Sequence, residues 1–168
     1  MNLTARLRPA ASALALAGLA AALAQATPAA AQYNREISHD PAKCRGNGPA
    51  VRISVTGVKR SSGKLRVQLY RATKQDWLET GRWLNRMELP ARAGTMSVCM
   101  PVPAPGTYGI AIRHDVNGNN ETDLTQDGGG ASNNPSFNIF NLGKPSHSKV
   151  GFAVGQEVKA ITIRLHYL

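Results

Sequence analysis

The sequence predicts an all-β protein built as a single antiparallel β-sandwich of about seven strands. Apolar and polar residues alternate with a period of two in several short segments, and turns rich in glycine and proline separate those segments. No segment keeps a sustained helical period. A chain of 168 residues with a removable leader suits one domain with one core.

The first 31 residues have the three regions of a secretory signal peptide. Arg6 and Arg8 supply positive charge, residues 10–24 form an Ala- and Leu-rich core, and Ala29–Ala31 supply small side chains. We expect cleavage after Ala31, and the loss of two arginines lowers the net charge from +10 to +8. The alternative is that the leader is retained as an N-terminal anchor. No later segment is long and apolar enough to span a bilayer. The protein is therefore expected in the periplasm or outside the cell.

The mature chain begins with an irregular polar segment, residues 32–50, that contains Cys44. Because an even number of cysteines in an exported chain favours a disulfide, we expect Cys44 to pair with Cys99 in a later strand. The bridge would close a loop of 55 residues and stabilise the fold by roughly 4 kcal/mol. Two buried, reduced thiols are the alternative.

The sandwich domain is expected to span residues 51–168. The segment VRISVTGV (51–58) and the segment KLRVQLY (64–70) alternate and form a hairpin around the turn KRSSG. Further strands are predicted at residues 96–102, 107–114, 149–154 and 160–167. The segment 73–90 predicts either a helical turn or a bent strand, with Trp77 and Trp83 covering one end of the core.

Several segments resemble the bacterial exported family called domain of unknown function 2141. They are GKLRVQLY, PAPGTYGIAIRHDVNGNNETDL, SNN at 132–134, and KPS at 144–146 ahead of VGFAV. The resemblance implies a compact sandwich of the prealbumin or immunoglobulin-like kind. The chain departs from the family pattern at Ala131, where an aromatic is common, and at His147, Ser148 and Lys149, where an aromatic and acidic residues are common. If those acidic residues help to bind an ion in the family, this chain binds it less well.

The segment HDVNGNNETDL (114–124) has the rhythm of a calcium-binding loop. Calcium takes oxygen ligands, and positions two apart in a tight loop converge on one point. The match fails at its sixth position, Asn120, and at its twelfth, Gln126, where a glycine and a glutamate are usual. A metal-free Asx turn is the alternative. The candidate calcium ligands, or loop-ordering residues, are Asp115, Asn117, Asn119, Glu121 and Asp123.

Basic residues are concentrated on and beside the first hairpin. A face of this kind attracts anionic partners such as lipid phosphates or acidic polysaccharide. A solvated face without a dedicated partner is the alternative, and nucleic acid is not expected in this compartment. The candidate anion-binding residues are Lys59, Arg60, Lys64, Arg66, Arg71 and Lys74.

The sequence favours a binding or structural module of the cell envelope over an enzyme. His114 and Asp115 are neighbours in a strand, so their side chains should point to opposite faces. Ser146 and His147 are loop neighbours, and no nucleophile motif or suggestive carboxylate pair is present. The expected function is that of a non-enzymatic envelope module, for which calcium binding by the loop is one candidate activity. Anion binding by the basic hairpin is the alternative, and a small hydrolase is a third hypothesis. The sequence does not indicate an oligomeric state.

Overall fold

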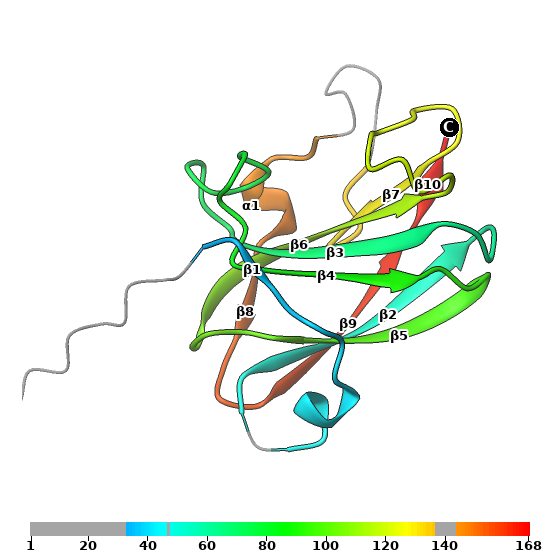
Figure 1. The fold of residues 1–168 in the computed structure, drawn as a ribbon. Helices are drawn as coiled ribbons and strands as arrows, with labels where there is room; N and C mark the ends of the chain where they lie inside the picture. The colour runs from blue at the N-terminus through cyan, green and yellow to red at the C-terminus, as the bar shows by residue number, and fades with distance from the viewer. Residues whose placement is uncertain (1–32, 47, 137–143) are drawn as a thin grey trace, which may run out of the picture.

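The computed structural model describes residues 33–46, 48–136 and 144–168 and consists of two β-sheets packed face to face (Figure 1). The larger sheet contains, in spatial order, β1 (Arg35–Glu36), β4 (Asn85–Pro90), β3 (Lys64–Arg71), β6 (Gly106–Asp115), β7 (Gly128–Ala131) and β10 (His166–Tyr167). A further strand, β8 (Phe152–Val154), pairs with the start of β6. The smaller sheet contains β5 (Gly94–Pro101), β2 (Ala50–Val58) and β9 (Val158–Arg164).

This arrangement confirms the all-β sandwich, and it adds two details that the alternation pattern does not contain. The pairs β1–β4 and β2–β9 are parallel, whereas the other pairs between described strands are antiparallel. The strand predicted at residues 160–167 is divided into β9 and β10, which belong to different sheets. The predicted signal peptide lies outside the described residues.

The core lies between the two sheets and consists of the apolar residues that alternate along each strand. The predicted inward residues of both segments are fully buried, for example Val51 and Ile53 in β2 and Leu65 and Val67 in β3. The predicted hairpin between these two segments is wrong, because the KRSSG turn carries the chain from the smaller sheet to the larger one and β2 and β3 pair with other strands. Burial of each such side chain contributes roughly 1.5–3 kcal/mol. The polar residues that alternate with them remain on the outer faces, where β3 and β6 present charged side chains.

The segment 73–90 forms turns followed by β4, and its tryptophans do not cover an end of the main core. Trp77 packs on the outer face of the larger sheet, in a separate cluster with Tyr70, Ala131 and Val150. The Trp77 and Tyr70 ring centroids are 5.4 Å apart in an edge-on arrangement, and the indole Nε1 donates to the Pro145 carbonyl at 2.8 Å. Alternation along a strand predicts which residues share a face, but it does not predict what covers the outer face.

The N-terminal segment contains β1 and a short 3-10 helix, η1 (Pro41–Cys44), so it is more regular than predicted. The predicted disulfide between Cys44 and Cys99 is present, and it joins η1 to β5. The Arg52 guanidinium also donates to the Cys44 carbonyl at 2.6 Å. The bridge therefore pins the leading segment to the smaller sheet, as expected.

The outer edge of β9 is completed by a side chain. Asn134 Nδ2 donates to the Thr162 carbonyl at 2.9 Å, and Asn134 Oδ1 accepts from the Arg164 amide at 2.7 Å. One carboxamide thus makes the two bonds that a neighbouring strand would make to this part of β9.

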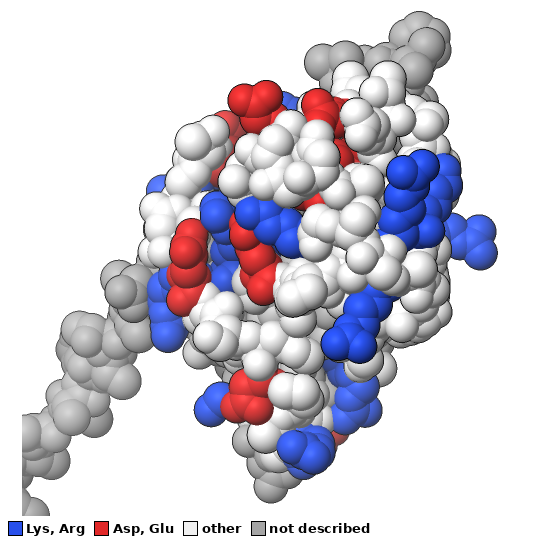
Figure 2. All heavy atoms as spheres, turned by 45° about the vertical axis from the view of Figure 1, so that its right-hand side comes forward, with Lys and Arg blue, Asp and Glu red and all other residues white. Residues whose placement is uncertain are grey.

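Within the described residues the only α-helix is α1, which has four residues (His147–Val150). No described helix is long and apolar enough to cross a membrane. Charged side chains are unevenly distributed over the surface. In the view of Figure 2, basic and acidic residues intermingle near the middle, whereas basic residues predominate along the right-hand side.

Candidate functional site

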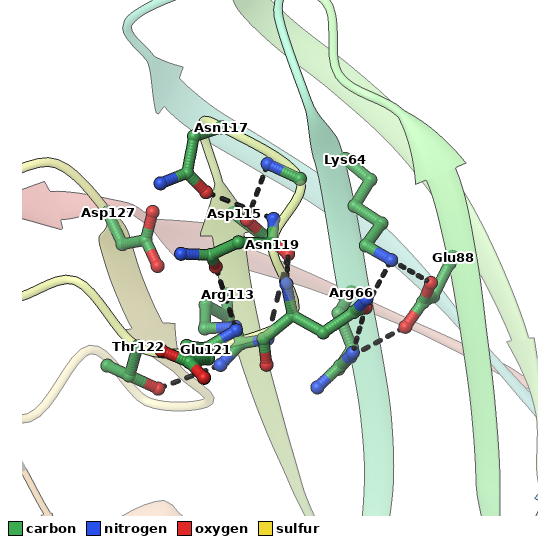
Figure 3. Close-up of polar contacts among 12 residues, drawn as sticks. Lys64, Arg66, Glu88, Arg113, Asp115, Asn117, Asn119, Glu121, Thr122 and Asp127 are labelled. Carbon is green, nitrogen blue, oxygen red and sulfur yellow. Dashed lines mark hydrogen bonds and ion pairs between the residues drawn. The ribbon is translucent and has the colours of Figure 1, made fainter.

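The predicted calcium loop connects β6 to β7, and Asp115 organises its first turn (Figure 3). Asp115 is completely buried at the end of β6. Its Oδ1 accepts from the Gly118 amide at 2.8 Å, and its Oδ2 accepts from the Asn120 amide at 2.9 Å. The backbone turns sharply here, because Gly118 and Asn120 have φ values of 76° and 71°.

The two asparagines at alternate positions form consecutive Asx turns. Asn117 Oδ1 accepts from the Asn119 amide at 3.0 Å, and Asn119 Oδ1 accepts from the Glu121 amide at 2.8 Å. Each is a side-chain bond to the backbone two residues on, which is the usual role of asparagine in turns. The Glu121 side chain is exposed.

Two aspartates complete the loop. Asp123 Oδ2 accepts from Asn117 Nδ2 at 2.6 Å and from Asn119 Nδ2 at 3.0 Å. Asp127 is buried, and its two oxygens accept from the Val116 amide at 3.0 Å and the Asp123 amide at 3.1 Å. The alternating oxygens therefore satisfy donors of the loop itself. Among the described residues, no group of three His, Cys, Asp or Glu side chains is arranged to hold a metal ion.

Three basic side chains on the larger sheet contact this loop. Lys64 Nζ and Arg66 Nη2 both donate to Asn120 Oδ1, the latter at 3.1 Å. Arg113 donates through Nη1 to Thr122 Oγ1 at 2.7 Å and through Nη2 to the Asn120 carbonyl at 2.8 Å. The loop and two of the predicted anion-binding residues, Lys64 and Arg66, are separate candidates in the sequence but form one network in the structure. We call these three cations the loop latch.

The sequence pattern does not indicate Arg113 as a site residue. Its role depends on the register between β3 and β6, which places Arg113 directly opposite Arg66. Its Nη2 also lies 3.8 Å from Asp115 Oδ2. Burial lowers the pKa of Arg113 and the charge of Arg66 lowers it further, while nearby carboxylates, chiefly that of Asp115, oppose the change. A periodic pattern gives the outward direction of Arg113 but not its cross-strand neighbour.

Glu88 on β4 balances part of the positive charge. It lies 2.9 Å from Lys64 Nζ, 2.7 Å from Arg66 Nε and 3.3 Å from Arg86 Nη2. Burial alone would raise the pKa of Glu88, but hydrogen bonds from Lys64 and Arg66 hold it below its usual value. One carboxylate is therefore shared by three cations.

A family comparison identifies the family to which this chain belongs. A bacterial family described as an uncharacterized protein conserved in bacteria, domain of unknown function 2141, matches residues 53–162. The chain belongs to this family. No curated protein and no solved structure matches the chain.

The segment matched to the domain of unknown function 2141 includes the whole loop and all three members of the loop latch. Cys44 and β10 lie outside it. The disulfide and the C-terminal strand are therefore features of this chain beyond the matched segment.

A cleft of about 300 Å³ lies on another side of the loop. Its lining contains two cations but no Asp or Glu side chain among the described residues. The lining residues are Lys59, Arg60, Val116, Thr125, Gln126, Tyr167 and Leu168.

Tyr167 is fixed in this cleft by several contacts. Its hydroxyl accepts from the Lys59 amide at 3.1 Å and shares a 2.6 Å hydrogen bond with His114 Nδ1. Lys59 Nζ lies 4.6 Å from the centre of the Tyr167 ring. Burial raises the pKa of Tyr167, while the bond from the Lys59 amide opposes the rise. These contacts, all within the protein, fix the Tyr167 wall of the cleft.

The six basic candidates divide into three pairs. Lys59 and Arg60 line the cleft, and Lys64 and Arg66 belong to the loop latch. The third pair, Arg71 and Lys74, is exposed at and beyond the opposite end of β3. The segment 59–74 is thus neither part of the predicted hairpin nor one continuous anion-binding face.

The histidine pairs considered for hydrolysis do not form a reactive arrangement. His114 is buried and bonds to Tyr167 and, through Nε2 at 2.9 Å, to the Ser62 carbonyl. The Asp115 carboxylate bonds to loop amides instead. Ser146 Oγ lies 3.1 Å from Ser148 Oγ. Neither pair couples a nucleophile to a base.

Proposed function

We propose that the protein is an exported, non-enzymatic binding module of the cell envelope and that its ligand is an anionic envelope component. The cleft between Lys59, Arg60, the loop and the C-terminal strand is the observation that carries this proposal. Two cations line it, and its described lining includes no Asp or Glu residue. The signal-like leader and the disulfide support an exported location.

The size and lining of the cleft suit one charged group attached to a larger molecule. A volume of about 300 Å³ is at the lower end for small-molecule sites. Thr125 and Gln126 add hydroxyl and amide groups, and Val116 and Leu168 add apolar surface. The positive charge of the whole chain would attract such a partner over a longer range.

A binding assay with two matched double variants tests the proposal. Lys59→Ala/Arg60→Ala removes the cations of the cleft, while Arg71→Ala/Lys74→Ala removes the same charge elsewhere. The probes are vesicles of phosphatidylglycerol and a polyuronate, each at low and high salt. We expect the cleft variant to bind about tenfold more weakly, the effect of roughly 1.4 kcal/mol, and the control variant to bind nearly as well as the wild type.

Equal losses in the two variants would contradict the proposal, because they would indicate attraction by net charge alone. If all variants lose binding to both probes equally at about 0.5 M salt, the attraction is again one of net charge, because screening at that salt removes long-range attraction. Retained binding by the cleft variant would place the ligand elsewhere.

Calcium binding by the loop remains a prediction from the sequence and is the competing function. It requires Asn117 and Asn119 to turn their amide oxygens toward Asp123, which now accepts from their nitrogens. Calorimetric titration of calcium, with magnesium as the control, tests it. Saturable binding with a Kd of about 10⁻⁴ to 10⁻³ M would support calcium binding, provided that Asp115→Ala/Asp123→Ala abolishes it. No heat up to about 10 mM, beyond that range, would identify an Asx turn.

A further inference from the structure

Two cations of the loop latch converge on a neutral oxygen. Lys64 Nζ and Arg66 Nη2 both donate to Asn120 Oδ1, and Arg113 Nη2 donates to the main-chain oxygen of the same residue. An amide oxygen carries no net charge, whereas an ionised oxygen at the same place would add Coulomb attraction to both cations. The position of the Asn120 carboxamide therefore favours a negatively charged oxygen over the group that fills it.

The latch cations repel one another, and the carboxylates that act on Arg113, those of Asp115, Asp127 and Glu88, are shared with other cations or already accept backbone amides. Arg66 and Arg113 lie directly opposite one another on β3 and β6, an arrangement of like charges that is unfavourable in a sheet. Glu88 is shared with Lys64 and Arg86. Asp115 lies 3.8 Å from Arg113 and already accepts two amides. The buried Nε of Arg113 has no hydrogen-bond partner in the described residues.

We infer that Lys64, Arg66 and Arg113 form a second, separate binding site for an oxyanion such as phosphate, and that the Asn120 side chain occupies it when no anion is bound. A phosphate oxygen would replace Asn120 Oδ1 and accept from Lys64 and Arg66. The source of the phosphate is either a free ion or a lipid headgroup. This site shares no side chain with the lining of the cleft.

The Asn120 side chain is free to leave without unfolding the loop. Asn120 is exposed, and its main chain stays held by the bond from its amide to Asp115 Oδ2 and the bond from Arg113 to its carbonyl. Rotation of the side chain alone vacates the position. Displacement of the carboxamide therefore costs only its two contacts with Lys64 and Arg66.

Two substitutions of Asn120 predict opposite effects on phosphate binding. Asn120→Asp keeps the shape of the side chain and supplies the carboxylate, so it should weaken phosphate binding by about tenfold or more. Asn120→Gly removes the side chain and suits the φ of 71°, so it should strengthen binding about threefold. Thermal unfolding of the mature chain against sodium phosphate, with sodium chloride at equal ionic strength as reference, measures both.

Gln75→Glu is the matched control, because it makes the same amide-to-acid change at an exposed residue in the turns that follow β3. The phosphate response is the rise in Tm in sodium phosphate over that in sodium chloride. An equal loss of this response in Gln75→Glu and Asn120→Asp would overturn the inference. The lack of any response in both the wild type and Asn120→Gly would overturn it as well. Lys59→Ala/Arg60→Ala should keep the response. If that variant loses it, the phosphate binds in the cleft, which supports the proposed function and overturns this inference.

Vesicles distinguish the two sources. A lipid headgroup is indicated if the protein sediments with phosphatidylglycerol vesicles but not with phosphatidylcholine vesicles. Asn120→Asp should then lose this sedimentation, and Gln75→Glu should keep it. A phosphate response without vesicle binding would indicate the free ion. Both results support the site.

Discussion

Replacement of Arg113 by methionine should loosen the β6–β7 loop while the sandwich stays folded. The change removes the bonds to Thr122 Oγ1 and to the Asn120 carbonyl, at 2.7 and 2.8 Å. Hydrogen bonds that involve a charged group contribute about 1.5–3 kcal/mol each. Methionine also relieves the repulsion from Arg66 and the cost of burying the guanidinium, so we expect a net destabilisation of about 1–2 kcal/mol.

Differential scanning calorimetry and amide hydrogen exchange measure this effect at two levels. For a domain of this size, about 1.5 kcal/mol lowers Tm by roughly 5 °C. Exchange of the Gly118 and Asn120 amides should accelerate, because their acceptor Asp115 loses its nearest cation. Exchange in β2 should change only by the global amount.

Arg113→Lys is the control, because it keeps the charge but loses the two-pronged geometry of the guanidinium. It should fall between the wild type and the methionine variant. A Tm of Arg113→Met equal to or above that of the wild type, together with unchanged exchange in the loop, would refute the reasoning that the latch orders the loop.

Three further predictions concern other parts of the fold. Gly128→Ala would place a Cβ 2.5 Å from Tyr167 Cζ, so thermal unfolding should show a decrease in unfolding free energy of about 1–3 kcal/mol. Gly129→Ala is the control, because the space around its Cβ is open, and it should change the unfolding free energy by less than about 1 kcal/mol. Cys44→Ser/Cys99→Ser should lower the unfolding free energy by about 4 kcal/mol in urea titration, and an unchanged midpoint would contradict the role given to the bridge. Because the pKa of Glu88 is held below its usual 4.5, its stabilising contribution is present above that value and is lost as the pH falls through the folded pKa. Glu88→Gln should therefore destabilise the protein at pH 7, and the difference in Tm from the wild type should shrink at acid pH; a constant difference would argue against the ion pairs.

The sequence predicts the parts of this fold that depend on local pattern or on residue count. The alternation of Leu65 and Val67 with Lys64 and Arg66 correctly separates core from surface. The pairing of Cys44 with Cys99 follows because only two cysteines are present. These inferences need no knowledge of which strands are neighbours.

The remaining features depend on which strands are neighbours, and periodicity does not contain that information. The parallel pairing of β2 with β9 brings together segments from opposite ends of the domain. The loop latch exists because the register of β3 and β6 places Arg113 beside Arg66, under the loop. The position of Trp77 depends on the small Gly109 beneath it, where a Cβ would lie 2.8 Å from the indole. Each is a long-range consequence of the fold.

The carboxamide of Asn134 has a consequence for how copies of this protein meet at high concentration. An open strand edge can recruit a strand from another molecule and so begin aggregation. Asn134 already holds the Thr162 carbonyl and the Arg164 amide of β9, so an incoming strand must first displace it. Aspartate lacks the donor, and most other side chains strain at its φ of 46°. A single exposed side chain thus helps to keep the folded protein from polymerising through this edge.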